Sequence, residues 1–196
     1  MIRRLAIAAA ALAAATAPAF AHLDPAEHGS FAAGFSHPLF GLDHILVMVA
    51  VGLWAASLKG RAMLVVPAAF VGTMGLGFIA AIGGMPLPFV EPVILASIIF
   101  IGIMVALALP FSTAGMAAAV AFFAFFHGHA HGGELGEAGA ASFAIGFMIA
   151  TALLHAVGIG LGIAFGKLQS RDGKSWLTRT AGAVTAAAGV ALAFGG

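Results

Sequence analysis

The stretch His37-Pro38-Leu39-Phe40-Gly41-Leu42-Asp43-His44 runs directly into ten mostly apolar residues, Ile-Leu-Val-Met-Val-Ala-Val-Gly-Leu-Trp. An ionisable side chain is costly inside a lipid bilayer, and it usually faces a pathway, a water-filled cavity or a binding site. The stretch places two histidines and an aspartate at the head of an apolar run. It therefore indicates a membrane protein that binds a polar species, with a cation as the first candidate.

The composition of the whole chain supports the membrane class. The chain has 196 residues, of which 62% are hydrophobic and 8% are charged, whereas soluble domains carry about 25% charged residues. Because so few charges cannot cover a water-exposed surface, we predict an all-α integral membrane protein. The chain has no cysteine, which excludes thiolate metal sites, disulfides and iron–sulfur clusters. No basic run indicates nucleic-acid binding.

Residues 1–21 have the three parts of a secretory signal peptide. Arg3 and Arg4 are followed by a short, alanine-rich apolar run and by Ala19-Phe20-Ala21, which fits the A-x-A cleavage pattern. We predict cleavage before His22, which places the new N-terminus outside the cytoplasmic membrane of a bacterial cell. An uncleaved anchor helix is the alternative.

Residues 22–196 contain six apolar stretches and are predicted to form a single six-helix transmembrane domain. A helix needs about 20 apolar residues to span a bilayer. We expect transmembrane helices at residues 37–57, 62–83, 90–109, 112–130, 140–166 and 176–195.

The basic residues predict the orientation of these helices. Outside the signal peptide, Lys and Arg occur between the first and second predicted helices, between the fifth and sixth, and at the start of the sixth: Lys59, Arg61, Lys167, Arg171, Lys174 and Arg179. With an external N-terminus, all of them are cytoplasmic, as the positive-inside rule requires. We therefore expect a multi-pass protein of the bacterial inner membrane with a periplasmic N-terminus.

The first polar cluster fits one face of a helix. Pro38 suits the first helical position, which makes His37 a candidate N-cap residue. His37 and His44 fall almost on one stripe at about 100° per residue, with Gly41 clearing space between them. Asp43 points about 120° away from the stripe that His37 and His44 share, and it either binds the cation or orients His44. The pattern predicts a cation path, and hydrogen bonds to neighbouring helices are the competing interpretation.

The second polar cluster is Phe-His-Gly-His-Ala-His-Gly-Gly-Glu at residues 126–134. His127 and His131 have the i, i+4 spacing that lets two imidazoles share a metal, and Glu134 follows three residues later. The glycines favour fraying, so we expect part of this segment to be a loop at the outer end of the fourth helix. A solvated loop that binds metal only incidentally is the alternative.

Two isolated histidines are further candidates. His155 lies near the middle of the fifth predicted helix, where a ligand, a proton relay and a structural histidine fit equally well. After cleavage, the free amine and the imidazole of His22 could chelate a divalent ion together, with His28 close behind.

Glycines predict close helix packing. Gly158, Gly162 and Gly166 form two successive G-x-x-x-G steps, a spacing that lets helices approach closely in lipid. We expect packing within one chain, and dimerisation is the alternative.

The ligand types narrow the choice of metal. Imidazole suits nickel, copper, zinc and iron, whereas carboxylate and water suit magnesium, calcium and manganese. The residues therefore indicate a borderline divalent transition metal, and cobalt, zinc and Cu²⁺ stay open beside nickel. No sequence motif indicates an organic cofactor.

The pattern His37-Pro38-Leu39-x-Gly41-x-Asp43-His44, continuing to the apolar residues 51–55, resembles the HupE/UreJ family of hydrogenase and urease accessory membrane proteins. The segment 126–134 and Leu154-His155 resemble the later histidines of that family, and the resemblance covers essentially the whole chain. It implies a nickel permease rather than an enzyme, serving nickel–iron hydrogenase or urease, with their maturation proteins as partners. It also implies that His37, Asp43 and His44 form the metal path.

The combined prediction is a secondary permease that moves Ni²⁺ from the periplasm to the cytoplasm. The residues expected to capture the ion outside are His22, His28, His127, His129, His131 and Glu134. The residues expected within the membrane are His37, Asp43 and His44, joined by His155 and Met48. An intramembrane zinc hydrolase, a cobalt or copper permease, and a metal sensor or chaperone are the alternatives.

Overall fold

A computed structural model describes residues 30–109, 111–135, 139–168 and 176–195, apart from the side chains of Glu134 and Leu135. The predicted signal peptide and the candidate ligands His22 and His28 lie outside the described residues, so those predictions stay untested.

The described residues form seven helices and no strand. The helices are α2 (Phe31–Phe40), α3 (Leu42–Leu58), α4 (Ala62–Ile82), α5 (Val90–Leu107), α6 (Thr113–Leu135), α7 (Ala140–Leu168) and α8 (Trp176–Phe194). Five of them are long and apolar enough to span a membrane, and the bent pair α2 and α3 makes a sixth span if it is counted as one. The predicted all-α polytopic fold is confirmed. The first span begins at Phe31 instead of residue 37, and α6 continues to Leu135 instead of ending at residue 130.

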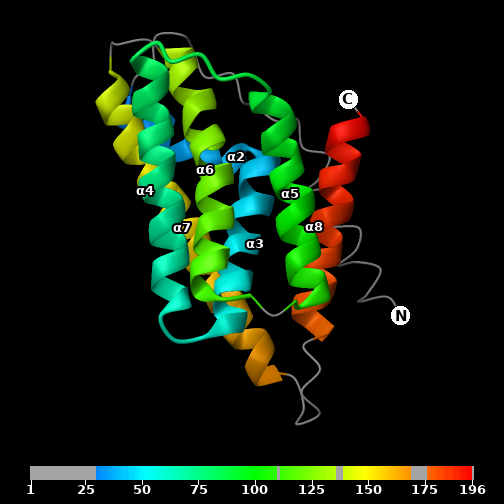
Figure 1. Cartoon of the computed structure of the whole chain (residues 1–196). Coiled ribbons are helices and arrows are strands. Elements are labelled where there is room, and N and C mark those ends of the chain that lie inside the picture. The colour runs from blue at the N-terminus through cyan, green and yellow to red at the C-terminus, as the bar shows by residue number, and fades with distance from the viewer. Residues whose placement is uncertain (1–29, 110, 136–138, 169–175, 196) are drawn as a thin grey trace, which may run out of the picture.

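Helix α3 is the centre of the bundle. It contacts α4, α5, α7 and α8, and Figure 1 shows it behind α6, between α4 and α5. Its residues from Val47 to Ala56 are almost all buried, and Trp54 packs edge-on against Phe100 and Phe111. The apolar run that follows His44 is therefore the core of the protein.

The first predicted helix is two helices that meet at an angle of 79°. Ser30 is the N-cap of α2, its Oγ accepting a hydrogen bond from the Ala33 amide at 3.0 Å. Pro38 lies inside α2, so the predicted N-cap role of His37 is wrong. Gly41 joins the two helices in an extended conformation, with φ −78° and ψ 114°, so His37 and His44 do not share one helical stripe.

Gly41 leaves the space that the polar side chains after it occupy. A Cβ atom on Gly41 would lie 2.9 Å from His44 Nδ1 and 3.0 Å from Asp43 Oδ1. Such distances are shorter than van der Waals contact, so a larger residue would displace one of these groups.

Glycines bring α3 and α7 into backbone contact. A Cβ on Gly158 would collide with the Val49 carbonyl, and one on Gly52 with the His155 carbonyl. A Cβ on Gly162 would lie 2.6 Å from the Cβ of Ala56, whereas one on Gly166 would meet nothing within 4 Å. The predicted packing within one chain is confirmed for Gly158 and Gly162.

Two glycines of the second polar cluster are also packing positions. A Cβ on Gly128 would collide with the Met74 carbonyl of α4, and one on Gly132 would lie 2.9 Å from Ala81 Cβ. Helix α6 continues to Leu135. The expectation of a frayed, partly loop-like segment is therefore wrong, because these glycines are held by α4.

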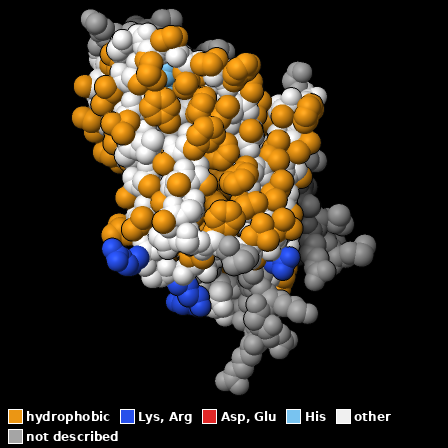
Figure 2. Space-filling view, viewed as in Figure 1, with side chains coloured by type: hydrophobic (Ala, Val, Ile, Leu, Met, Phe, Trp, Pro, Cys, Tyr) orange, Lys and Arg blue, Asp and Glu red, His pale blue; other side chains and the backbone are white. Residues whose placement is uncertain are grey.

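The basic side chains lie at one end of the bundle. Figure 2 shows Lys and Arg gathered at the lower end, below a surface rich in hydrophobic side chains. The described ones are Lys59, Arg61, Lys167 and Arg179. Arg179 also donates a hydrogen bond to the Ala106 carbonyl at 2.8 Å, which ties α8 to α5. The α4–α5 connection, the C-terminal end of α6 and the N-terminal end of α7 lie at the opposite end (Figure 1), as the predicted topology requires.

We expect Gly158→Ala to destabilise the protein in detergent by about 1–3 kcal/mol, because the added methyl group overpacks the α3–α7 contact. Fluorescence-detected thermal unfolding measures this, since Trp54 reports on α3. Gly160→Ala is the matched control, because a Cβ there meets nothing within 4 Å. Equal unfolding temperatures for the two variants would contradict the helix contact described above.

Candidate metal centre

Three histidines from three helices meet near the end of the bundle opposite the basic side chains. His37 comes from α2, His44 from α3 and His131 from α6, and one ring nitrogen of each lies within 4.8 Å of the others. His44 and His131 are buried, and His37 is half-buried. We call this group the three-histidine cluster. The sequence predicted His37 and His44 together, and the structure adds His131 to them.

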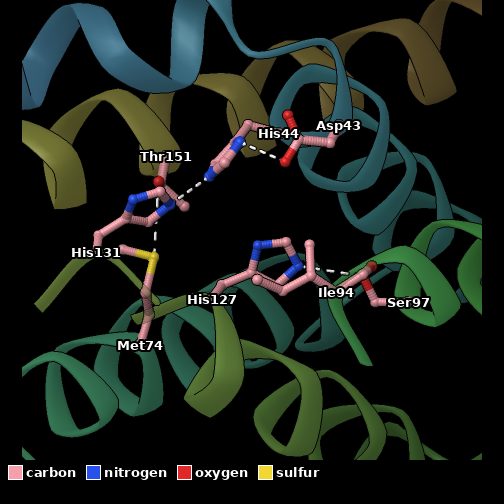
Figure 3. A network of polar contacts seen from close by, with 8 residues as sticks. All are labelled: Asp43, His44, Met74, Ile94, Ser97, His127, His131 and Thr151. Atoms are coloured by element: carbon pink, nitrogen blue, oxygen red, sulfur yellow. Dashed lines mark hydrogen bonds and ion pairs between the residues drawn. The ribbon is translucent and has the colours of Figure 1, made fainter. Parts of the chain in front are cut away.

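A direct contact joins the two buried members of the cluster. His44 Nε2 lies 2.8 Å from His131 Nε2, so one nitrogen donates a hydrogen bond and the other accepts it. Figure 3 shows His44 between His131 on one side and Asp43 on the other. His131 was expected in an external capture segment, but it lies inside the bundle because α6 continues as a helix past it.

Asp43 supplies the charge beside the cluster. Its Oδ2 lies 2.9 Å from His44 Nδ1, and the side chain is 32% exposed. His44 Nδ1 makes no aligned hydrogen bond, because the two residues are neighbours on one helix and the N–H direction misses the oxygen. The contact is therefore electrostatic, and Asp43 acts on the cluster through His44.

Aromatic rings surround the cluster. The ring centroid of Phe147 lies 4.7 Å from that of His131, 5.9 Å from that of His44 and 6.1 Å from that of His37. Phe143 stacks on Phe147 and also faces His37. The chain has 17 phenylalanines. The sequence pattern assigns none of them to the site, because an aromatic residue at helical spacing is equally typical of an ordinary core.

His127 lies one helical turn further into the membrane than His131. It is completely buried, and its Nε2 lies 3.1 Å from Ser97 Oγ on α5. Its ring centroid is 5.6 Å from that of His44. The predicted external position of His127 is therefore wrong. Ser97 is a contact residue that the sequence analysis missed, since an isolated serine in an apolar helix carries no spacing signal.

His155 lies still deeper. It is 1% exposed, and neither ring nitrogen has a hydrogen-bond partner among the described residues. The Phe70 ring covers it edge-on at 4.9 Å and also packs against His127 at 5.8 Å. His155 is thus separate from the three-histidine cluster.

The other predicted ligands are not brought into the cluster. The imidazole of His129 donates to the Met85 carbonyl at 2.7 Å, at the α4–α5 connection. Met48 is buried in the core of α3, and no described contact joins it to the histidines. Glu134 belongs to α6, but its side chain is outside the description.

The cluster has the donor set of a transition-metal site. Imidazole nitrogens bind such ions at about 2.0–2.1 Å, which places two ligands of one ion about 3.0–3.4 Å apart. The observed 2.8 Å between His44 and His131 needs less than about 1 Å of widening to reach that spacing. An ion would then replace the shared hydrogen between the two rings.

Comparisons with known proteins identify the family of the chain. The family model described as HupE / UreJ protein matches residues 10–192. Protein HupE of Rhizobium leguminosarum bv. viciae is 42% identical over 187 residues, which cover 94% of this chain and 95% of that protein. No solved structure matches the chain. Since the family match extends over nearly the whole chain, the resemblance drawn from the histidine motifs is confirmed, and this protein belongs to the HupE/UreJ family.

Proposed function

We propose that this protein is a secondary permease that carries Ni²⁺ inward across the bacterial inner membrane. The observation that carries the proposal is the three-histidine cluster, which lies within membrane-spanning helices. An ionisable cluster at such a position is a pathway or a binding site by default. Family membership supports nickel as the ion.

The ligands favour a borderline transition metal over magnesium or calcium. Three imidazoles and one nearby carboxylate suit nickel, cobalt, zinc and copper. The chain has no cysteine, which leaves no thiolate to hold a soft ion permanently. We infer a transport site rather than a catalytic one, with cobalt, zinc and copper as competing substrates to be tested.

The position of the cluster supports entry from the periplasmic side. The described Lys and Arg residues at the opposite end support a cytoplasmic location for that end, and His37 and Asp43 are both partly exposed. The chain carries no nucleotide-binding motif, so the membrane potential is the proposed driving force. It supplies about 2.3 kcal/mol per elementary charge per 100 mV, which is about 4.6 kcal/mol for a divalent ion.

We propose that the imported nickel serves the maturation proteins of hydrogenase or urease. The name of the family is the support for this part of the proposal.

His131→Ala is expected to abolish nickel uptake, whereas His129→Ala is expected to retain most of it at saturating nickel. The two residues are close neighbours on α6, but only His131 belongs to the cluster, and His129 bonds to a backbone carbonyl. Uptake of radioactive nickel by cells expressing each variant at equal membrane levels measures the difference. Loss of uptake in both variants, or in neither, would show that the cluster is not the transport site.

Asp43→Asn is expected to lower nickel uptake about 10-fold or more, a typical loss when a group that supports a metal ligand is changed. The substitution preserves size but removes the negative charge that lies 2.9 Å from His44. Nickel affinity of the purified variant, measured by calorimetry in detergent, separates a binding defect from poor expression. Unchanged affinity and uptake would mean that the charge has no part in transport.

Metal specificity is tested by the same uptake assay with excess unlabelled cobalt, zinc or copper. We expect weak competition from each of them. Strong displacement by one of these metals would make that metal the substrate, and uptake equal to that of empty-vector cells would favour a sensor or a hydrolase.

A further inference from the structure

His127 is the buried polar group that the three-histidine cluster does not use. It lies on α6 four residues before His131, which places it about 6 Å further into the membrane. Its side chain is completely buried. One ring nitrogen contacts Ser97, and the other, Nδ1, has no hydrogen-bond partner among the described residues.

The hydrogen of the Ser97 hydroxyl decides which nitrogen of His127 carries its own hydrogen. Ser97 Oγ lies 2.6 Å from the Ile94 carbonyl and 3.1 Å from His127 Nε2. A hydroxyl has a single hydrogen, and serine in a helix commonly donates it to a carbonyl of the preceding turn. The oxygen then accepts from His127, so Nε2 carries the hydrogen and Nδ1 keeps a free electron pair.

The free electron pair lies on the side of the ring that faces the cluster. Figure 3 shows Nδ1 of His127 on the edge toward His44 and His131, with Nε2 on the edge toward Ser97. The ring centroids of His44 and His127 are 5.6 Å apart. A buried nitrogen that faces other imidazoles without any hydrogen donor suits a cation.

We propose that Ser97 is the positioning residue that fixes the tautomer of His127, so that this predicted ligand presents Nδ1 to the ion inward of the three-histidine cluster. The ion is a divalent transition-metal cation, which moves from His44 and His131 to Nδ1 of His127. This inference rests on the proposed function, because it extends the same pathway by one step.

The tautomer is measured by nitrogen NMR on the purified, metal-free full chain labelled with ¹⁵N-histidine, since protonated and unprotonated ring nitrogens have well-separated shifts. His127→Gln assigns the signals. We expect His127 to be protonated at Nε2 in the wild type and in Ser97→Thr, and to become a mixture of tautomers in Ser97→Ala. A wild-type His127 protonated at Nδ1, or a Ser97→Ala spectrum identical to the wild type, would overturn the proposal.

Nickel uptake tests whether the tautomer matters for transport. We expect Ser97→Ala to lower the uptake rate at saturating nickel about 10-fold, by the usual effect of losing a hydrogen bond to a metal ligand. Ser97→Thr, which retains the hydroxyl, is expected to restore it. Ser57→Ala is the matched control, because Ser57 makes the same bond to a preceding carbonyl, that of Trp54 at 2.6 Å, without a described histidine contact.

The outcomes separate this inference from the proposed function. If the wild type takes up no nickel, the permease proposal fails, and the coordinating role of His127 falls with it. If the wild type transports nickel and Ser97→Ala transports at the same rate despite a changed tautomer, the permease proposal stands and the role of His127 is refuted. An equal loss in Ser97→Ala and Ser57→Ala also refutes it, because the effect is then one of helix stability.

Discussion

The contact between His44 and His131 is the interaction on which the rest of the site depends. A buried polar group without a partner is costly, and more so where lipid replaces water. At 2.8 Å the two imidazoles satisfy each other across residues that are 87 positions apart in the chain. They join α3 to α6, and the bend at Gly41 brings His37 of α2 to the same point. In the proposed function, a cation substitutes for this hydrogen bond, so folding and the proposed ion binding use the same atoms.

Backbone contacts hold these imidazoles in place. Gly128 and Gly132 press α6 against α4, while Gly52 and Gly158 press α3 against α7. Lipid gives little hydrophobic drive for helices to associate, so small residues that permit close approach carry much of the packing. The histidines lie between these contacts: His131 is adjacent to Gly132, and the carbonyl of His155 faces Gly52. A ligand set built on tightly packed helices stays in position without a bound metal, which preorganises it for an ion.

The amino-acid sequence predicted the membrane class and the approximate positions of the spanning helices, because apolar length is a local signal. It also predicted His37, Asp43 and His44 as a unit. It did not predict the bend at Gly41, because Pro38 indicated the first turn of a helix, whereas α2 already begins at Phe31 and contains Pro38. The contacts of Gly34 and Gly146 between α2 and α7 are long-range, and so is the contact of Ser97 with His127. No local pattern encodes which distant helix will lie alongside.

The glycines of the second cluster illustrate why the local argument failed there. In water, glycine destabilises a helix by about 1 kcal/mol relative to alanine, so a segment with several glycines is expected to fray. Here the missing side chains of Gly128 and Gly132 allow the backbone of α4 to approach, and packing outweighs intrinsic propensity. The continued helix turns His127 and His131 inward instead of leaving them in a loop. The same residues that suggested an external capture segment therefore build the inner wall of the site.

Buried ring nitrogens without described hydrogen-bond partners lie at two depths below the three-histidine cluster. His127 Nδ1 and both ring nitrogens of His155 are buried without hydrogen-bond partners among the described residues. Such groups are rare in native proteins and call for a physical explanation. In the proposed function, imidazoles at successive depths offer a divalent ion successive ligands, and Asp43 beside His44 offsets part of its charge. A site with more carboxylates would hold the ion more tightly and release it more slowly. The imidazole nitrogens without partners among the described residues therefore fit the proposed passage of the ion.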